Sequence, residues 1–177
     1  MALVINGIDV SAITGIAPVT VRGVTVQFLP YSRPTASSLI GRGGETAEGQ
    51  RIRRLREAIH HINSRIRHHA AANRYFKRIP AVSGASAQSL DALLSGPDIL
   101  ICLDPTLTGP PLAAATPIGQ RRISITAFGF SGSGRSVEAT IIHELAHVNG
   151  ASNTTRDAED ALRHSRMGDQ FDPSAVG

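Results

Sequence analysis

The sequence predicts an α+β domain, and two patterns along the chain lead to that prediction. The first part of the chain holds short segments in which apolar and polar residues alternate, as strands do. Later segments repeat their apolar residues at steps of three and four, as helices do. With 177 residues, of which 41% are hydrophobic, the chain suits one domain with its own core. We therefore expect a single domain over residues 1–177, with N-terminal strands and a loop in 1–45 and further helices and strands in 46–177.

Strands are expected at the start of the chain. The first ten residues predict a small hairpin, because two apolar segments flank Asn6-Gly7, the strongest two-residue signal for a hairpin turn. Residues 19–28 also alternate between apolar and polar side chains. Gly23 inside that run indicates either a bulge or a second tight turn.

One long amphipathic helix is expected over residues 47–77, after a loop rich in Pro, Ser and Gly at 30–46. Arg and His occupy its polar face, and Pro80 stops it. Its apolar stripe consists of Ile52, Leu55, Ile59, Ile62 and Ile66.

The second half of the chain supplies the rest of a small mixed sheet. Strands are expected at residues 98–103 and 122–130. A turn-rich loop at residues 104–111 separates them.

Two helices are expected to complete the domain. Ser136 is suited to cap a helix over residues 137–148, and Gly150 is suited to end it. A final helix, capped by Thr154 or Thr155, is expected to follow.

The basic residues are concentrated in one segment. The chain has 18 Lys and Arg residues against 14 acids, and half of the basic ones lie between Arg51 and Arg78, where Glu57 is the only acid. Such a face suits contact with nucleic acid, an acidic partner or a membrane surface, although a solvated helix face explains it more simply. The same helix holds two histidine pairs, which we interpret as part of the basic face rather than as a second metal site: His60, His61, His68 and His69.

The single cysteine, Cys102, excludes an intrachain disulfide and is expected to be a buried, inert thiol. Any metal site must therefore use histidines and carboxylates. No apolar run approaches the 18 or so residues of a membrane-spanning helix. The N-terminus lacks the basic and apolar stretches of a signal peptide, so we expect the cytoplasm, or export by a route without a cleaved signal.

The segment His143-Glu-Leu-Ala-His147 has the spacing of a metal site on a helix. Four residues turn an α-helix by about 400°, so both imidazoles project from one face and can share one ion. Zinc suits neutral imidazole ligands and four-fold coordination. Glu144 flanks such an ion without ligating it, and can take a proton from water activated there. We expect one Zn²⁺ per chain.

This segment resembles the active-site helix of the zincin metallopeptidases, whose shared motif is H-E-x-x-H. The resemblance covers residues 137–167 and implies a compact zincin-like fold with the H-E-x-x-H helix and a C-terminal helix. The order of long helix, strands and active-site helix is similar to that of zincins as well. In that family the last strand before the helix often pairs with extended substrate. Residues 123–128 would be that strand here.

The third ligand is the open question of this resemblance. Metzincins continue the motif with a Gly and a third His, but this chain has Asn153 after Gly150, so we reject that branch and interpret Met167 as a packing residue. The remaining candidates follow in one stretch: Asp157, Glu159, Asp160 and His164. A gluzincin-like site implies Glu159, which we favour, and an aspzincin-like site implies Asp157. Each acid taken alone is equally typical of a helix's first turn.

The resemblance implies a zinc-dependent endopeptidase acting on a peptide or protein, with Glu144 as general base and His164 as a donor to the developing oxyanion. The short chain is similar to bacterial metallopeptidases, including effectors delivered into other cells. Two alternatives come from other classes of protein. One is a nucleic-acid-binding module that uses the helix between Arg51 and Arg78, and the other is a zinc-stabilised protein without catalysis.

Overall fold

The computed structural model describes residues 4–5, 8–9, 20–21, 24–28, 40–41, 44–45, 47–82, 86–103, 113–126, 128–130 and 133–167. Side chains are described from residue 50 onward, except those of Ile52, Leu100, Cys102 and Leu103. The expected burial of the Cys102 thiol, the turns at Asn6-Gly7 and Gly23, and the loop at 104–111 lie outside these residues.

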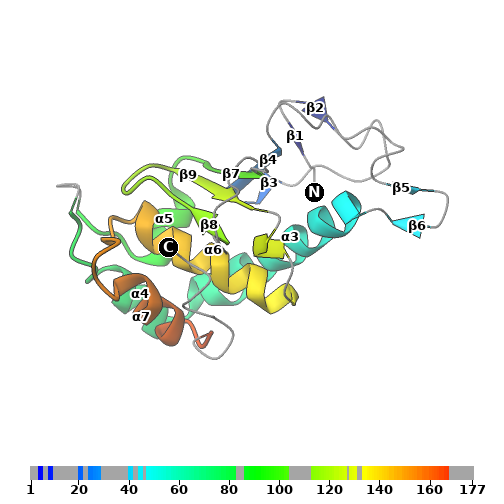
Figure 1. Ribbon diagram of the computed structural model, residues 1–177. Coiled ribbons are helices and arrows are strands. Elements are labelled where there is room, and N and C mark those ends of the chain that lie inside the picture. Colours follow the sequence, from blue (N-terminus) through cyan, green and yellow to red (C-terminus); the bar gives the residue numbers. More distant parts are fainter. Residues whose placement is uncertain are drawn as a thin grey trace.

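A five-stranded mixed sheet forms the centre of the fold (Figure 1). Its order is β3 (Thr20–Val21), β4 (Val24–Phe28), β7 (Ile99–Leu103), β9 (Arg122–Ile125) and β8 (Ala114–Ala115). The three central strands run parallel to one another, whereas β3 and β8 are antiparallel to their neighbours. Because β4 pairs with β7, the sheet joins segments on both sides of residue 45.

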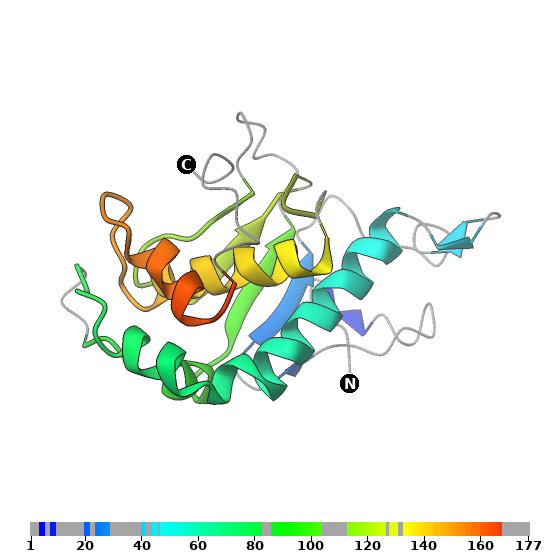
Figure 2. The same cartoon turned by 90° about the horizontal axis from the view of Figure 1, so that it is seen from below.

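Helices α3 (Ala47–Ser64) and α6 (Gly134–Val148) lie side by side on one face of this sheet (Figure 2). Further helices are η1 (Ile66–His68), α4 (Ala70–Phe76), α5 (Leu90–Ser95), η2 (Phe128–Phe130) and α7 (Asp157–His164). α7 packs on α6 and α4. A mixed sheet with helices against it confirms the α+β class.

The core lies between the sheet and these helices. Its largest fully buried side chains are Phe76, Leu55, Ile59, Ile62, Leu90, Leu94 and Ile99. Four members of the expected apolar stripe are buried, namely Leu55, Ile59, Ile62 and Ile66. Met167 is also buried in the core, which confirms its interpretation as a packing residue. In the part of the chain that the structure describes, no helix is long and apolar enough to cross a membrane.

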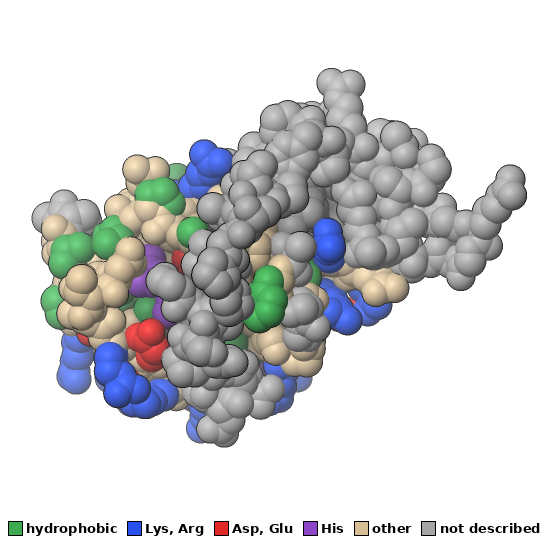
Figure 3. Space-filling model, in the orientation of Figure 1, with side chains coloured by type: hydrophobic (Ala, Val, Ile, Leu, Met, Phe, Trp, Pro, Cys, Tyr) green, Lys and Arg blue, Asp and Glu red, His purple; other side chains and the backbone are tan. Residues whose placement is uncertain are grey.

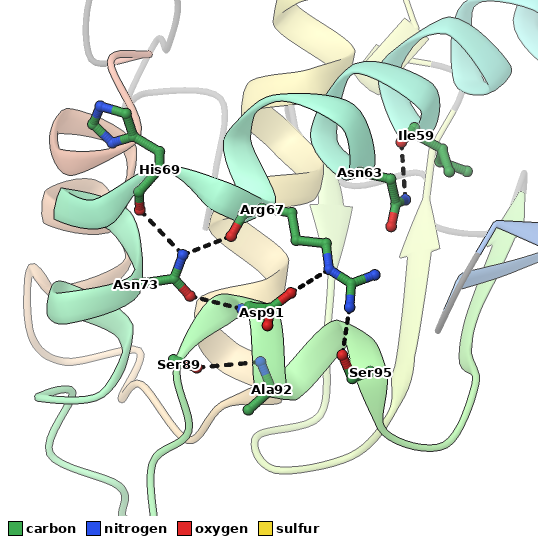
Figure 4. Close-up of polar contacts among 9 residues, drawn as sticks. All are labelled: Ile59, Asn63, Arg67, His69, Asn73, Ser89, Asp91, Ala92 and Ser95. Carbon is green, nitrogen blue, oxygen red and sulfur yellow. Dashed lines mark hydrogen bonds and ion pairs between the residues drawn. The ribbon is translucent and has the colours of Figure 1, made fainter.

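The prediction of one continuous helix over 47–77 is wrong, because the helix is interrupted between Arg65 and His69. His69 has an extended backbone, with φ −71° and ψ 119°, and α4 starts after it. The amide of Asn73 donates to the carbonyls of Arg67 and His69, so these backbone acceptors are satisfied outside a regular helix (Figure 4).

Arg67 lies within this interruption of the helix. Its guanidinium is buried and donates to the carboxylate of Asp91 and the hydroxyl of Ser95, both at α5 (Figure 4). A buried charge needs such partners, and they come from a helix that the sequence did not predict. The expectation that this arginine belongs to a solvated face is therefore wrong.

The hairpin at the N-terminus is confirmed by β1 (Val4–Ile5) and β2 (Ile8–Asp9), which pair across two residues. β3 and β4 also pair antiparallel, with Val21 opposite Val24. Two short strands, β5 (Ile40–Gly41) and β6 (Gly44–Glu45), pair within the stretch expected to be a loop.

The remaining differences concern where elements begin and end. The expected strand at 122–130 ends at Ile125, and residues 128–130 form η2 instead. α6 starts earlier than expected, because the Ser133 hydroxyl accepts from the Ser136 amide and caps it. The N-cap of α7 is Arg156 rather than a threonine. In α7, Asp157, Glu159 and Asp160 in the first turn complement the helix dipole.

Candidate metal centre

The H-E-x-x-H segment forms the C-terminal half of α6. His143, Glu144 and His147 are 4%, 1% and 7% exposed, so the three polar side chains are removed from bulk water. α6 packs against α3, α7, β8 and β9, which explains why both its apolar and its polar residues are buried. Burying polar side chains without hydrogen-bond partners destabilises a fold, so a cluster of three buried polar residues indicates a functional role.

The two imidazoles converge on one point. The Nε2 atoms of His143 and His147 lie 3.1 Å apart, and the rings meet edge to face with their centroids 4.8 Å apart. Two nitrogens that ligate one tetrahedral zinc ion at its usual bond length are about 3.3 Å apart. The separation of the two nitrogens therefore fits either a shared ion or a shared proton.

The second ring nitrogen of His147 decides which tautomer it takes. Its Nδ1 lies 3.0 Å from the carbonyl oxygen of Ala151. A carbonyl only accepts, so Nδ1 carries the proton and Nε2 of the neutral ring keeps its lone pair. Metal-bound histidines are commonly oriented by this kind of hydrogen bond.

Gly150 makes that contact by turning the chain back onto α6. Its φ is 101°, a conformation that residues with a Cβ rarely adopt. The Ala151 amide donates to the Ala146 carbonyl and the Gly150 amide to the His147 carbonyl, a Schellman C-cap. The prediction that Gly150 ends the helix is confirmed.

The side chain of Glu144 is buried, and one of its carboxyl oxygens lacks a hydrogen-bond partner among the described residues. Burial raises its pKa to about 7, and the nearby hydroxyl of Thr116 acts in the opposite direction. Its Oε2 is buried without a hydrogen-bond partner among the described residues, and so is the Thr116 hydroxyl. A carboxyl with such a pKa exchanges protons near neutrality.

His143 is favoured in its neutral form. Burial, followed by the neighbouring His147, lowers the pKa of His143 to about 3. A neutral imidazole is the form that ligates a metal ion.

The edge of the sheet beside α6 is β8, not the strand that the sequence suggested. β9 pairs with β7 on one side and β8 on the other, so it has no free edge for a substrate. In the described sheet β8 is the outer strand and packs on α6. The segment after β8 brings Thr116 towards Glu144, and the amide of Gly119 donates to the carbonyl of His147.

The acids expected to supply a third ligand have different surroundings. The carboxylate of Asp157 accepts hydrogen bonds from the hydroxyls of Tyr75 and Thr155. Asp160 forms an exposed ion pair with Arg163. Glu159 has a buried Oε2 without a partner among the described residues.

His164 is exposed at the end of α7 and stacks on Tyr75, with ring centroids 4.5 Å apart. Burial and the charge of Asp157 raise the pKa of Tyr75 above its ordinary value, so the phenol stays a hydrogen-bond donor. No local pattern predicts this contact, because Tyr75 and His164 lie on different helices far apart along the chain.

Figure 3 shows histidine and acidic side chains reaching the surface close together, over the C-terminal half of α6. Among the described residues there is no group of three or more His, Cys, Asp or Glu side chains that could hold a metal ion. The structure thus brings two of the expected ligands together, and the identity of the third stays a prediction. Comparison of the chain with models of protein families, with curated proteins and with solved structures finds no match.

Proposed function

We propose that this protein is a zinc-dependent endopeptidase with a zincin-like site. The observation that supports this most directly is the 3.1 Å separation of the His143 and His147 Nε2 atoms beside the buried Glu144. A sequence motif alone would leave the histidine rings free to point apart. Here their separation fits the two nitrogen ligands of one tetrahedral ion.

His143, His147 and Glu159 would hold the ion. Glu159 is preferred over Asp157 because the latter already accepts two hydrogen bonds, whereas Glu159 Oε2 has no partner among the described residues. Ion binding would draw the Glu159 carboxylate from α7 towards the two imidazoles. When bound, zinc supplies Lewis acidity that lowers the pKa of water towards about 7 and polarises a carbonyl.

Side chains of the protein would carry out the proton transfers. Glu144 accepts a proton from water as the water oxygen bonds to the carbonyl carbon of the scissile peptide. As the carbon–nitrogen bond breaks, Glu144 passes this proton to the leaving amine. His164 stays the candidate donor to the oxyanion, with its ring placed by stacking on Tyr75.

The outer strand β8 suggests how an extended peptide would be held. It presents an unpaired strand edge in the described sheet, and its following residues approach both Glu144 and His147. A peptide that added to this edge would be bound by backbone hydrogen bonds beside the catalytic carboxylate.

The proposal is tested by measuring zinc and peptide hydrolysis in the same preparations. We expect about one zinc per chain in protein purified without chelators. Glu144→Ala should retain that zinc and lose activity on an unstructured protein substrate by about 100-fold or more, because general base catalysis supplies that much. Glu57→Ala, at an exposed residue of α3, is the matched control and should stay active. Protein that never binds zinc, or a fully active Glu144→Ala, would disprove the proposal.

A further inference from the structure

A polar pocket lies away from the H-E-x-x-H site. It has a volume of about 250 Å³ and is formed by the end of α3, η1, the first half of α6 and the residues that follow α7. Figure 2 shows the end of α7 lying beside α6 and facing α3. Its wall on α6 includes Glu138, which precedes His143 by five residues. At 3.6 residues per turn these two positions are about 140° apart, so the pocket opens on the other side of the helix.

The pocket has an excess of positive charge. Arg65, Arg135 and Arg166 line it, all three are exposed, and their side chains make no hydrogen bond or ion pair within the part of the chain that the structure describes. The carboxylate on its wall, Glu138, is buried and accepts a hydrogen bond from Nδ1 of His61, whereas no described acid pairs with the three arginines. Three guanidinium groups therefore remain available to an anion.

Two buried polar groups in the same wall also lack partners. Ser165 is 5% exposed, and its hydroxyl makes no hydrogen bond with any described residue. The Nδ1 atom of His69 is buried and unpartnered on the same basis. Buried polar atoms are normally satisfied, so two unpartnered atoms on residues that line one pocket favour a polar ligand there, which these side chains would meet by turning towards it.

Arg166 is held in the pocket at a conformational cost. Its φ is 62°, and it occupies the position after α7 where a Schellman cap usually has glycine. The caps of α6 and α7 have the same hydrogen bonds, from Ala151 to Ala146 and from Met167 to Leu162. Only the first has glycine at the left-handed position. A strained arginine in place of a glycine suggests that its side chain is needed.

We propose that this pocket binds the terminal phosphate group of a small phosphorylated ligand. A phosphomonoester has two negative charges for the arginines and acceptor oxygens for the Ser165 hydroxyl and the guanidinium groups. A monoester carries more charge than the single charge of a diester within a nucleic-acid backbone, so it matches the excess of arginines better. A neighbouring depression shares Arg135 and extends to Ser133 at the start of α6, which leaves room for the rest of the ligand.

The test is titration calorimetry on the full chain at constant ionic strength, with phenyl phosphate as the probe. We expect saturable binding of one phenyl phosphate and none of dimethyl phosphate. Arg135→Ala and Arg166→Gly should each weaken binding about tenfold or more, because each removes a charged hydrogen bond. Arg74→Ala removes an exposed arginine of α4 outside the pocket and should bind as the unmodified protein does.

Three results would overturn the proposal. One is equal binding of the monoester and the diester, and another is equal weakening by Arg74→Ala and Arg135→Ala. The third is an oligothymidine without terminal phosphates that displaces phenyl phosphate, which would indicate a nucleic-acid surface instead. Circular dichroism on each variant shows that it is folded. The Glu144→Ala variant should bind phenyl phosphate with unchanged affinity, because Glu144 lies outside this pocket. Failure of the peptidase proposal would therefore leave the phosphate-site proposal standing.

Discussion

Nδ1 of His147 and the carbonyl oxygen of Ala151 are 3.0 Å apart, so the turn that ends α6 also fixes the tautomer of the second proposed ligand. The contact exists because Gly150 adopts a left-handed conformation and brings the chain back onto the helix. Helix termination and the orientation of the His147 ring therefore depend on the same residue.

Gly150→Ala should destabilise the protein by about 1–2 kcal/mol, because a Cβ is strained at this φ of 101°. The same change should weaken zinc binding about tenfold, since the hydrogen bond from His147 to Ala151 would be displaced. Urea unfolding measures the first effect, and competition with a chromogenic chelator measures the second.

Gly134→Ala is the matched control for that substitution. A Cβ at Gly134 meets nothing within 4 Å, and the residue is the first of α6. The Gly134→Ala variant should be as stable as the unmodified protein and should bind zinc with the same affinity. If Gly150→Ala kept full zinc affinity while losing stability, the cap would stabilise the fold without orienting the ligand.

Glu159→Gln and Asp157→Asn distinguish the two candidates for the third ligand. Glu159→Gln should weaken zinc binding by about 100-fold, because it removes a charged ligand. Asp157→Asn should change zinc affinity by less than about tenfold, since its carboxylate already accepts hydrogen bonds from Tyr75 and Thr155. The same chelator competition measures both variants, and the reverse order would assign the site to Asp157.

The parts of the fold that were predicted correctly are those encoded by nearby residues. The apolar stripe of α3, the two-residue hairpin and the glycine after α6 each depend on a few consecutive positions. The placement of His143 and His147 on one face belongs with them, because helical spacing alone determines it, whereas their role as metal ligands stays a prediction.

The parts that were missed depend on contacts between distant residues. Arg67 bonds to Asp91 across 24 positions, and this contact accompanies the break that periodicity could not reveal. Tyr75 reaches Asp157 across 82 positions. β8 has only two residues, too few for any periodic signal, yet it forms the sheet edge beside Glu144.

The contact between Arg67 and Asp91 predicts a loss of stability in acid. The hydrogen bond from Arg67, followed by its charge, lowers the pKa of Asp91 below its ordinary value of 3.8. The pair therefore stabilises the fold fully above pH 3.8, and its contribution is lost as the pH falls through the lowered pKa. Because the Asp91 side chain is 49% exposed, we expect a modest effect.

Urea unfolding of the unmodified protein and Asp91→Asn checks this prediction. The difference in unfolding free energy between them should be constant from pH 7 to pH 5 and shrink towards zero below pH 3.8. Asp98→Asn, on an exposed acid before β7, is the control and should show no such loss. A difference between Asp91→Asn and the unmodified protein that persists in strong acid would mean that the carboxylate charge is not involved.

Arg166→Gly should stabilise the protein by about 0.5–1 kcal/mol, although it removes a long side chain. Glycine relieves the left-handed strain at φ 62°, and its greater freedom in the unfolded chain offsets part of this gain. Arg166→Ala removes the same side chain but keeps the strain, so it should give no stabilisation.

Both variants should lose phenyl phosphate binding to the same extent. A gain in stability from Arg166→Gly together with a loss of binding would show that the arginine is kept for its ligand. Equal stability of the two variants would instead show that this backbone conformation costs little.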